Sequence, residues 1–299
     1  MKIYTHDDLI WSSGCMSLED NIVKKLKSST NCKVQLVDSV DYNTATSNNC
    51  LITDNHFLND RKNVIQLAPE FWHIYYFEHE LQNITPIYKF NCLMNRLSGE
   101  RLMLLYKLQE RDLVHDNIIS FNCSLHNQID ATVSERKKRY RDFHRDCQWP
   151  HWNEVHTELY SHIPKFLPAD IDPDTAAMLS EVTIVVESYV SDTVIAFSEK
   201  IFRALQTPRP WLLFCSPGSV ALLRSYGFDV LNDLIDHSYD AIEKDNRRVD
   251  KILNQINKIH FNSARCKQAA AHNRLILKDL ATKWPAKLDK IIKDVTITV

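Results

Sequence analysis

Glycine is scarce in this chain of 299 residues, which contains only Gly14, Gly99, Gly218 and Gly227. An average protein holds about 7% glycine, so a chain of this length normally carries roughly 20. The four positions do not form a G-x-G-x-x-G dinucleotide turn, a glycine-rich phosphate loop or a G-x-S-x-G nucleophile elbow. A nucleotide bound by this protein therefore has to be held mainly by side chains and helix ends.

Other features are also missing. The formal net charge is only -2, so no overall basic field draws the chain to nucleic acid. The eight cysteines include no C-x-x-C pair, which is typical of a reduced intracellular protein rather than a disulfide framework. No stretch reaches the ~18 apolar residues of a membrane span, and residues 1–11 contain no apolar signal core. We therefore expect a soluble, cytoplasmic protein.

The first 85 residues alternate between strand and helix patterns. The patterns predict strands at 2–4, 33–37, 50–53 and 64–67 and a helix at 19–28, which is typical of a small parallel α/β layer. Pro86 then opens a new segment. We expect two domains, residues 1–85 and residues 86–299, with the boundary near this proline.

The second segment repeats the alternation of strands and helices. Strands are predicted at 87–92, 118–121, 183–188 and 211–215, and helices at 100–111, 134–147, 199–206 and 217–226. A helical pattern then runs from Asp240 to Lys283. The chain is therefore predicted to be an α/β protein of two lobes with a helical C-terminal extension.

Charged residues gather where one predicted strand ends and the next helix begins. Glu187 lies at the end of the strand at 183–188, and Glu199 and Lys200 occupy the first turn of the helix at 199–206. Ligands of open α/β sheets bind at the carboxyl ends of strands. A glutamate can accept hydrogen bonds from ribose hydroxyls, and a lysine can neutralise a diphosphate. The alternative is a solvated helical turn, whose dipole favours an acidic residue in any case.

These residues carry a family resemblance. The segments V-E-S at 186–188 and F-S-E-K-I-F-R-A-L at 197–205 resemble the donor-binding motif of the alpha-1,3-fucosyltransferase family. The segment F-N-C-L-M-N-R-L-S-G-E-R-L-M-L-L-Y at 90–106 is similar to the start of that family's second domain. The chain also resembles phage-borne glycosyltransferase-like proteins, through S-P-G-S at 216–219 and G-F at 227–228. The resemblance covers about residues 86–260.

The resemblance implies a GT-B architecture of two facing Rossmann-like lobes, and sugar transfer with inversion and without a metal or other cofactor. It places Glu199 at the ribose of the donor and Lys200 at its diphosphate. Arg101, with Arg96 as a second candidate, would neutralise the leaving phosphates. Glu187 corresponds to the strand-end glutamate beside the donor sugar, where it would assist catalysis electrostatically.

Three positions depart from the family motif. Its Asn, Tyr and Thr are replaced here by Ser188, Phe197 and Ser198. The departures leave the identity of the donor open. Each of the two arginines could equally form a surface salt bridge instead of a phosphate contact.

The resemblance puts the catalytic base in the first lobe, where the sequence does not align with the family. Asp54 directly follows the strand predicted at 50–53, and Glu70 lies among aromatic residues that would raise its pKa toward the range of a general base. A turn or N-cap role is the alternative for Asp54. Other first-lobe candidates are Asp7, Asp8, His6 and His56.

Two further clusters have a functional and a plain interpretation. A cysteine and three histidines have loosely metal-like spacing, but Pro150 interrupts them, so we expect no metal there. They are His144, Cys147, His151 and His156.

The helix predicted at 134–147 carries basic residues that suit nucleic-acid phosphates, although such a run usually forms a solvated helix face. They are Arg136, Lys137, Lys138, Arg139, Arg141 and Arg145.

Together these patterns predict a glycosyltransferase that uses a nucleotide-diphosphate sugar as co-substrate. The acceptor would be a glycan or a nucleic acid, including a modified DNA base held by the basic run. A phage-encoded enzyme of this kind would act in the host cytoplasm. The alternative function is a non-catalytic nucleic-acid-binding protein that uses the basic helix 136–145.

Overall fold

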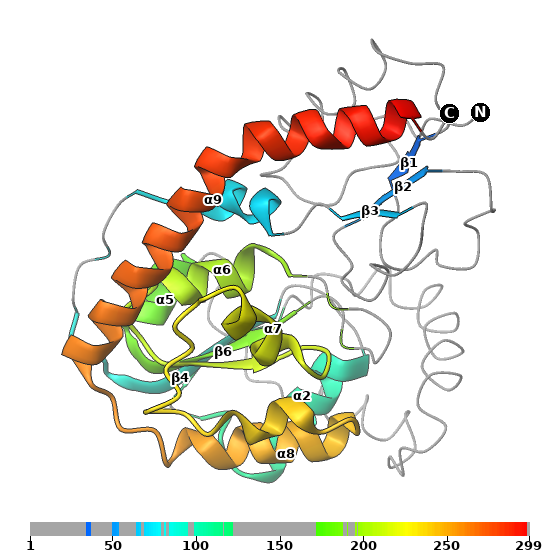
Figure 1. The fold of residues 1–299 in the computed structure, drawn as a ribbon. Helices are drawn as coiled ribbons and strands as arrows, with labels where there is room; N and C mark the ends of the chain where they lie inside the picture. The colour runs from blue at the N-terminus through cyan, green and yellow to red at the C-terminus, as the bar shows by residue number, and fades with distance from the viewer. Residues whose placement is uncertain are drawn as a thin grey trace.

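The computed structural model describes the chain from strand β1 to the C-terminal helix α9, with gaps (Figure 1). The first 66 residues contribute three short strands to this description. The predicted elements at 2–4, 19–28 and 134–147 lie outside the described residues. Beyond the three strands, the described ranges are 69–78, 81, 84–94, 99–115, 117–121, 172–187, 190, 195 and 197–297.

The first sheet consists of β1 (Val34–Leu36), β2 (Cys50–Thr53) and β3 (Val64–Gln66). The strands pair in parallel in the order β1-β2-β3, with Ile52 opposite Leu36 on one side and Ile65 on the other. The predicted strands at 33–37, 50–53 and 64–67 and their parallel arrangement are therefore confirmed.

The second sheet is parallel throughout and has four strands in the order β5-β4-β6-β7. Its central strands are the longest, and Cys92 of β4 lies opposite Ile119 of β5 and Ile184 of β6. Sheets buried on both faces are built from nearly continuous apolar runs, which is the pattern that predicted these strands. The strands are β4 (Tyr88–Met94), β5 (Ile118–Phe121), β6 (Ser180–Val186) and β7 (Trp211–Phe214).

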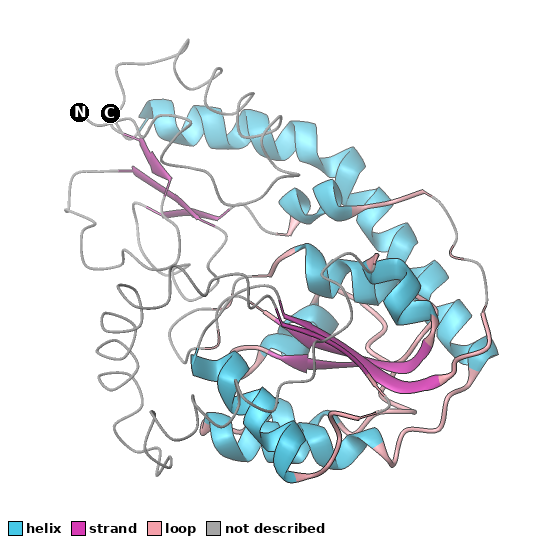
Figure 2. Cartoon of the chain, turned by 180° about the vertical axis from the view of Figure 1, so that it is seen from behind, coloured by secondary structure: helices cyan, strands magenta, loops and turns pink. Residues whose placement is uncertain are grey.

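Helices cover both faces of this sheet. α6 and α9 lie on one side, and α2 and α8 lie on the other (Figures 1 and 2). The result is a mixed α/β fold that is consistent with a Rossmann-like arrangement. Among the described helices, none combines the length and the apolar character needed to cross a membrane. The helices are α2 (Gly99–Glu110), α5 (Pro173–Met178), α6 (Glu199–Gln206), α7 (Ser219–Ser225), α8 (Asp245–Ile256) and α9 (Ser263–Ile297), with 3-10 helices η3 (Glu70–Tyr75) and η5 (His237–Ala241).

An aromatic cluster joins η3 to the core of the second sheet. Trp72 is 2% exposed, and its ring lies 5.5 Å from that of Phe197, 5.2 Å from Phe202 and 5.1 Å from Tyr226. Burial of such a large side chain stabilises the contact between η3 and α6. Residues of η3 therefore belong to the core of the second sheet, although they precede the domain boundary that the sequence predicts near Pro86.

The C-terminal helix α9 extends beyond Lys283, where the sequence pattern predicted the end of the helical segment. A break at residues 257–262 separates α8 from α9, and α9 continues through Pro285 to Ile297. Proline removes one helical hydrogen bond, so it normally favours a helix end. Here tertiary packing outweighs that cost, because Trp284 is buried and Lys287 forms an ion pair with Glu70 of η3.

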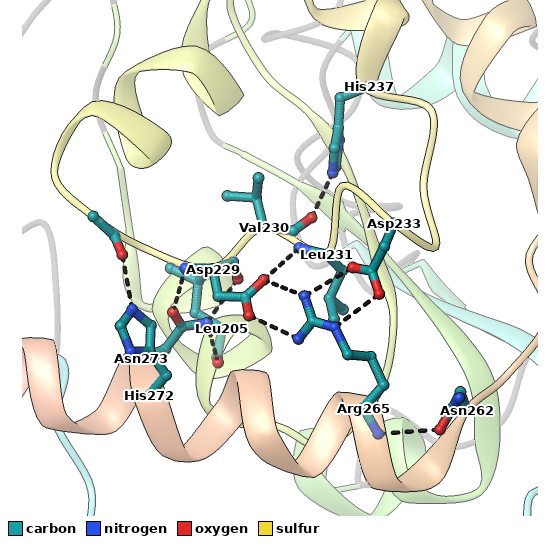
Figure 3. A network of polar contacts seen from close by, with 11 residues as sticks. Leu205, Asp229, Val230, Leu231, Asp233, His237, Asn262, Arg265, His272 and Asn273 are labelled. Carbon is teal, nitrogen blue, oxygen red and sulfur yellow. Dashed lines mark hydrogen bonds and ion pairs between the residues drawn. The ribbon is translucent and has the colours of Figure 1, made fainter.

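Two side chains anchor the first turns of α9 to the rest of the fold (Figure 3). The guanidinium of Arg265 donates to the carboxylates of Asp229 and Asp233 over 2.7–2.9 Å. The amide of Asn273 donates to the carbonyl oxygen of Leu205 at 2.9 Å and accepts the backbone N–H of Asp229 at 2.8 Å. The Asn273 contact holds α9 against the end of α6, and the hydrogen bonds from Arg265 lower the pKa of the Asp229 carboxyl.

Two buried residues of η5, Tyr239 and His237, connect it to strand β7 and to Val230. The hydroxyl of Tyr239 accepts the backbone N–H of Leu213 at 3.2 Å and donates to Nδ1 of His237 at 2.9 Å. This arrangement leaves the ring hydrogen on Nε2, which lies 2.6 Å from the carbonyl oxygen of Val230 (Figure 3). Burial lowers the pKa of His237 to about 4, so the ring is neutral in the folded protein at neutral pH.

This histidine is expected to make folding sensitive to acid. An unfolded histidine has a pKa near 6.5, so the unfolded chain takes up a proton first as the pH falls. The stabilisation is complete above that value and is lost as the pH falls toward 4, by about 3 kcal/mol in total. His237→Gln keeps a donor and an acceptor without titrating. Urea unfolding of both proteins between pH 7.5 and 4 measures the difference, and parallel pH curves would contradict the assignment.

Candidate functional site

The candidate site lies where the strand order of the second sheet reverses. β5 follows β4 in sequence and pairs with one edge of it, whereas β6 pairs with the opposite edge. The connections after β4 and after β6 therefore diverge at the carboxyl end of the sheet. Such a reversal opens a crevice that binds ligands in open α/β folds. The described residues that follow β4 and β6 include the polar and charged residues Arg101, Glu187, Ser198, Glu199 and Lys200.

Glu187 follows β6 directly and is 1% exposed. Its backbone N–H donates to the carbonyl oxygen of Phe214, at 3.1 Å, which extends the pairing of β6 with β7. Its carboxylate accepts the backbone N–H of Ser198 at 3.2 Å and the Ser198 hydroxyl at 2.5 Å. A buried carboxylate is costly unless hydrogen bonds satisfy it, and both of its oxygens are satisfied here. Glu187 thus connects the end of β6 to the start of α6.

Helix α6 begins with an N-cap serine, followed by an acidic residue and a lysine. Ser198 accepts the backbone N–H of Lys200, the arrangement that makes serine a favourable N-cap. The Lys200 ammonium lies 3.0 Å from the Ser198 hydroxyl, 3.2 Å from the Glu199 carboxylate and 4.0 Å from the Glu187 carboxylate. The cation is therefore held at the carboxyl edge of the sheet while a quarter of its side chain stays exposed.

Arg101 brings a second cation to the same edge from the first turn of α2. It is 3% exposed, and its Nη2 atom donates to the carbonyl oxygen of Glu187 at 3.5 Å. Its charge also opposes the effect of burial on Cys92 of β4, whose thiol pKa is raised to about 12. Arg101 therefore lies between the ends of β4 and β6. Cations from two helix starts therefore both lie against Glu187, Arg101 at its carbonyl oxygen and Lys200 near its carboxylate.

At the end of β7, a side chain of the protein caps the helix that follows. Asp240 accepts the backbone N–H groups of Val220 and Ala221, at 3.0 and 2.9 Å, and so satisfies the first turn of α7. Burial raises the pKa of the Asp240 carboxyl. Gly218 precedes α7 with a φ of 82°, a conformation that glycine adopts without strain. Asp240, which caps α7, belongs to η5, and nothing in the sequence indicates that pairing.

The predicted site residues divide into three groups. Glu187, Glu199, Lys200 and Arg101 come together as described above. Glu70 lies on η3, where its carboxylate is 3.3 Å from the Lys287 ammonium; burial, with a smaller contribution from the Glu70 charge, raises the pKa of Tyr226. Outside the described residues lie the candidate bases His6, Asp7, Asp8, Asp54 and His56, together with Arg96, the basic run Arg136–Arg145 and the cluster of His144, Cys147, His151 and His156.

The arrangement suits an anionic ligand. Lysine and arginine provide charge-assisted hydrogen bonds to phosphate oxygens, and the N-terminal ends of α2 and α6 add partial positive charge. Ser198, which the sequence marks only as a departure from the family motif, joins the buried carboxylate to the lysine. Its position immediately before an amphipathic helix is the sequence feature that predicts an N-cap serine. Within the described part of the chain, no group of three histidine, cysteine or acidic side chains could hold a metal ion.

Comparison with known proteins leaves the family open. No protein-family model, no curated protein and no solved structure matches this chain.

Proposed function

We propose that this protein is a glycosyltransferase that binds a nucleotide-diphosphate sugar at the carboxyl edge of β4 and β6. The observation that carries the proposal is the meeting of Arg101 and Lys200 at the buried Glu187, where the strand order reverses. A diphosphate is the ligand that best matches two cations beside one residue and two helix starts. The scarcity of glycine agrees with this mode of binding, because no glycine-rich loop is needed.

In the proposed reaction, the donor's diphosphate lies against Lys200 and Arg101, and Glu199 binds the ribose. The two cations would stabilise the charge that develops on the departing diphosphate, a task that many enzymes leave to a metal ion. A carboxylate, either Asp54 after β2 or Glu70 of η3, would take the proton from the acceptor hydroxyl as it attacks the anomeric carbon. The proposal includes inversion, two facing lobes, and an acceptor that is a glycan or a modified DNA base.

Lys200→Ala tests this proposal. We expect it to weaken the binding of the preferred nucleoside diphosphate by roughly 10- to 100-fold, because one charge-assisted hydrogen bond is lost. Isothermal titration calorimetry with uridine, guanosine and cytidine diphosphates provides the measurement. Lys107→Ala is the matched control, since Lys107 is also about a quarter exposed and also pairs with acidic residues, Glu110 and Asp250. Equal binding by all three proteins, or no binding by the unaltered protein, would overturn the assignment.

A further inference from the structure

The hydroxyl group of Ser198 uses its full hydrogen-bonding capacity within the candidate site. A serine hydroxyl has one hydrogen to donate and two lone pairs that accept. The Oγ atom lies 2.5 Å from Oε2 of Glu187, which can only accept, so the hydrogen points to that carboxylate. The two lone pairs then face the backbone N–H of Lys200, at 3.4 Å, and its ammonium, at 3.0 Å.

Glu199 competes for the same ammonium. Its carboxylate lies 3.2 Å from the Lys200 Nζ atom and is half exposed, so it draws the cation toward solvent. A lysine side chain has four rotatable bonds, and holding it in one position costs conformational entropy. The Ser198 hydroxyl counteracts this effect of Glu199. Its hydrogen bond keeps the Lys200 ammonium 4.0 Å from the Glu187 carboxylate, next to the end of β6.

We infer that Ser198 is a positioning residue for ligand binding: its hydroxyl bridges Glu187 and Lys200 and presets the ammonium for the phosphate of the ligand. The inference rests on the proposed function, because it assigns Ser198 a part in the same anion site. Ser198 acts through Lys200 and does not contact the reacting atoms. A preorganised group loses less entropy when the ligand arrives, which strengthens binding.

The test measures the binding of uridine, guanosine and cytidine diphosphates by titration calorimetry. Ser198→Ala is expected to weaken the preferred diphosphate about tenfold, the effect of one lost hydrogen bond. Ser198→Thr keeps the hydroxyl and restores binding to within about threefold of the unaltered protein. In the double variant Ser198→Ala/Lys200→Ala, binding is no weaker than with Lys200→Ala alone. Such non-additivity identifies two residues that act as one unit.

Loss of the helix cap needs its own control, since Ser198→Ala also removes an N-cap. Asp172→Ala removes the cap of α5, where the Asp172 carboxylate accepts the backbone N–H of Thr175 at 2.9 Å. Ser198→Ala should lower the urea midpoint more than Asp172→Ala, because it also removes the hydroxyl donor of the buried Glu187 carboxylate, and only Ser198→Ala should weaken binding. This inference would be overturned if Ser198→Ala bound the diphosphate with full affinity while Lys200→Ala bound it weakly. Additive losses of affinity in the double variant would also overturn it. Either result would leave the proposed function standing. No binding by the unaltered protein would overturn both.

Discussion

Arg209→Leu is expected to lower the free energy of unfolding by about 3–5 kcal/mol, because several hydrogen bonds from one buried charged donor are lost together. Arg209 is 1% exposed, its charge lies 4.5 Å over the ring of Phe261, and burial lowers the pKa of its guanidinium. Without the guanidinium, several buried carbonyl oxygens lose a donor, and each unsatisfied acceptor is costly. The acceptors are the carbonyl oxygens of Ser180, Pro208, Ile84 and Met178, at 2.5–3.1 Å.

Arg203→Leu is the matched control for that experiment. Arg203 lies on α6 and pairs with Asp174 at 2.9 Å, but more than a third of its side chain is exposed. Exposed ion pairs contribute about 0–1 kcal/mol, so this variant should unfold near the midpoint of the unaltered protein. Chemical denaturation followed by circular dichroism measures both. If the two variants lost equal stability, the hydrogen bonds of Arg209 would not be what joins the start of β6 to the segment before β4.

Glu187→Ala is expected to have the second large effect, a loss of about 3–5 kcal/mol in the free energy of unfolding. The Ser198 hydroxyl, the Ser198 N–H and the Lys200 ammonium all face this buried carboxylate, and each would lose its contact. Glu187→Gln keeps one acceptor oxygen for Ser198. It should therefore cost only about 1–2 kcal/mol, close to the value of one buried hydrogen bond.

The control for Glu187 is on β6, the strand that Glu187 follows. Glu181 of β6 pairs with Lys89 of β4 at 2.6 Å, and about a third of each side chain is exposed. Glu181→Ala should cost no more than about 1 kcal/mol. Urea unfolding and nucleoside diphosphate titration on all three variants separate the two roles of Glu187. A loss of binding without a loss of stability would show that Glu187 contacts the ligand directly rather than through Ser198 and Lys200.

Most elements of the second sheet could be predicted because their signal is local. The run W-L-L-F at β7 and the pattern of Ile201, Phe202 and Leu205 on α6 follow the periodicities of a buried strand and an amphipathic helix. η3 and α5 are short, and η3 packs on α9, which lies far away in the sequence. Such short elements are stabilised by tertiary contacts rather than by their own propensity.

The candidate site was predictable in part for the same reason. Charged residues directly after strands and at helix starts are visible in the sequence, and the sheet rule places them at one edge. The sequence could not show that Lys287 pairs with Glu70 or that Asp240 fills the start of α7. Those pairings join residues that only the folded chain brings together.

The sequence by itself determined the parallel strands, the absence of glycine-rich phosphate loops, and which charged residues follow β6 and begin α6. These properties depend on residue type and spacing along the chain. Only the tertiary structure decided that Arg101 and Lys200 meet at Glu187, and that the hydroxyl of Ser198 joins the carboxylate to the ammonium. The physical reason is that a hydrogen bond requires its two atoms to lie about 3 Å apart, and such distances depend on the order and packing of strands.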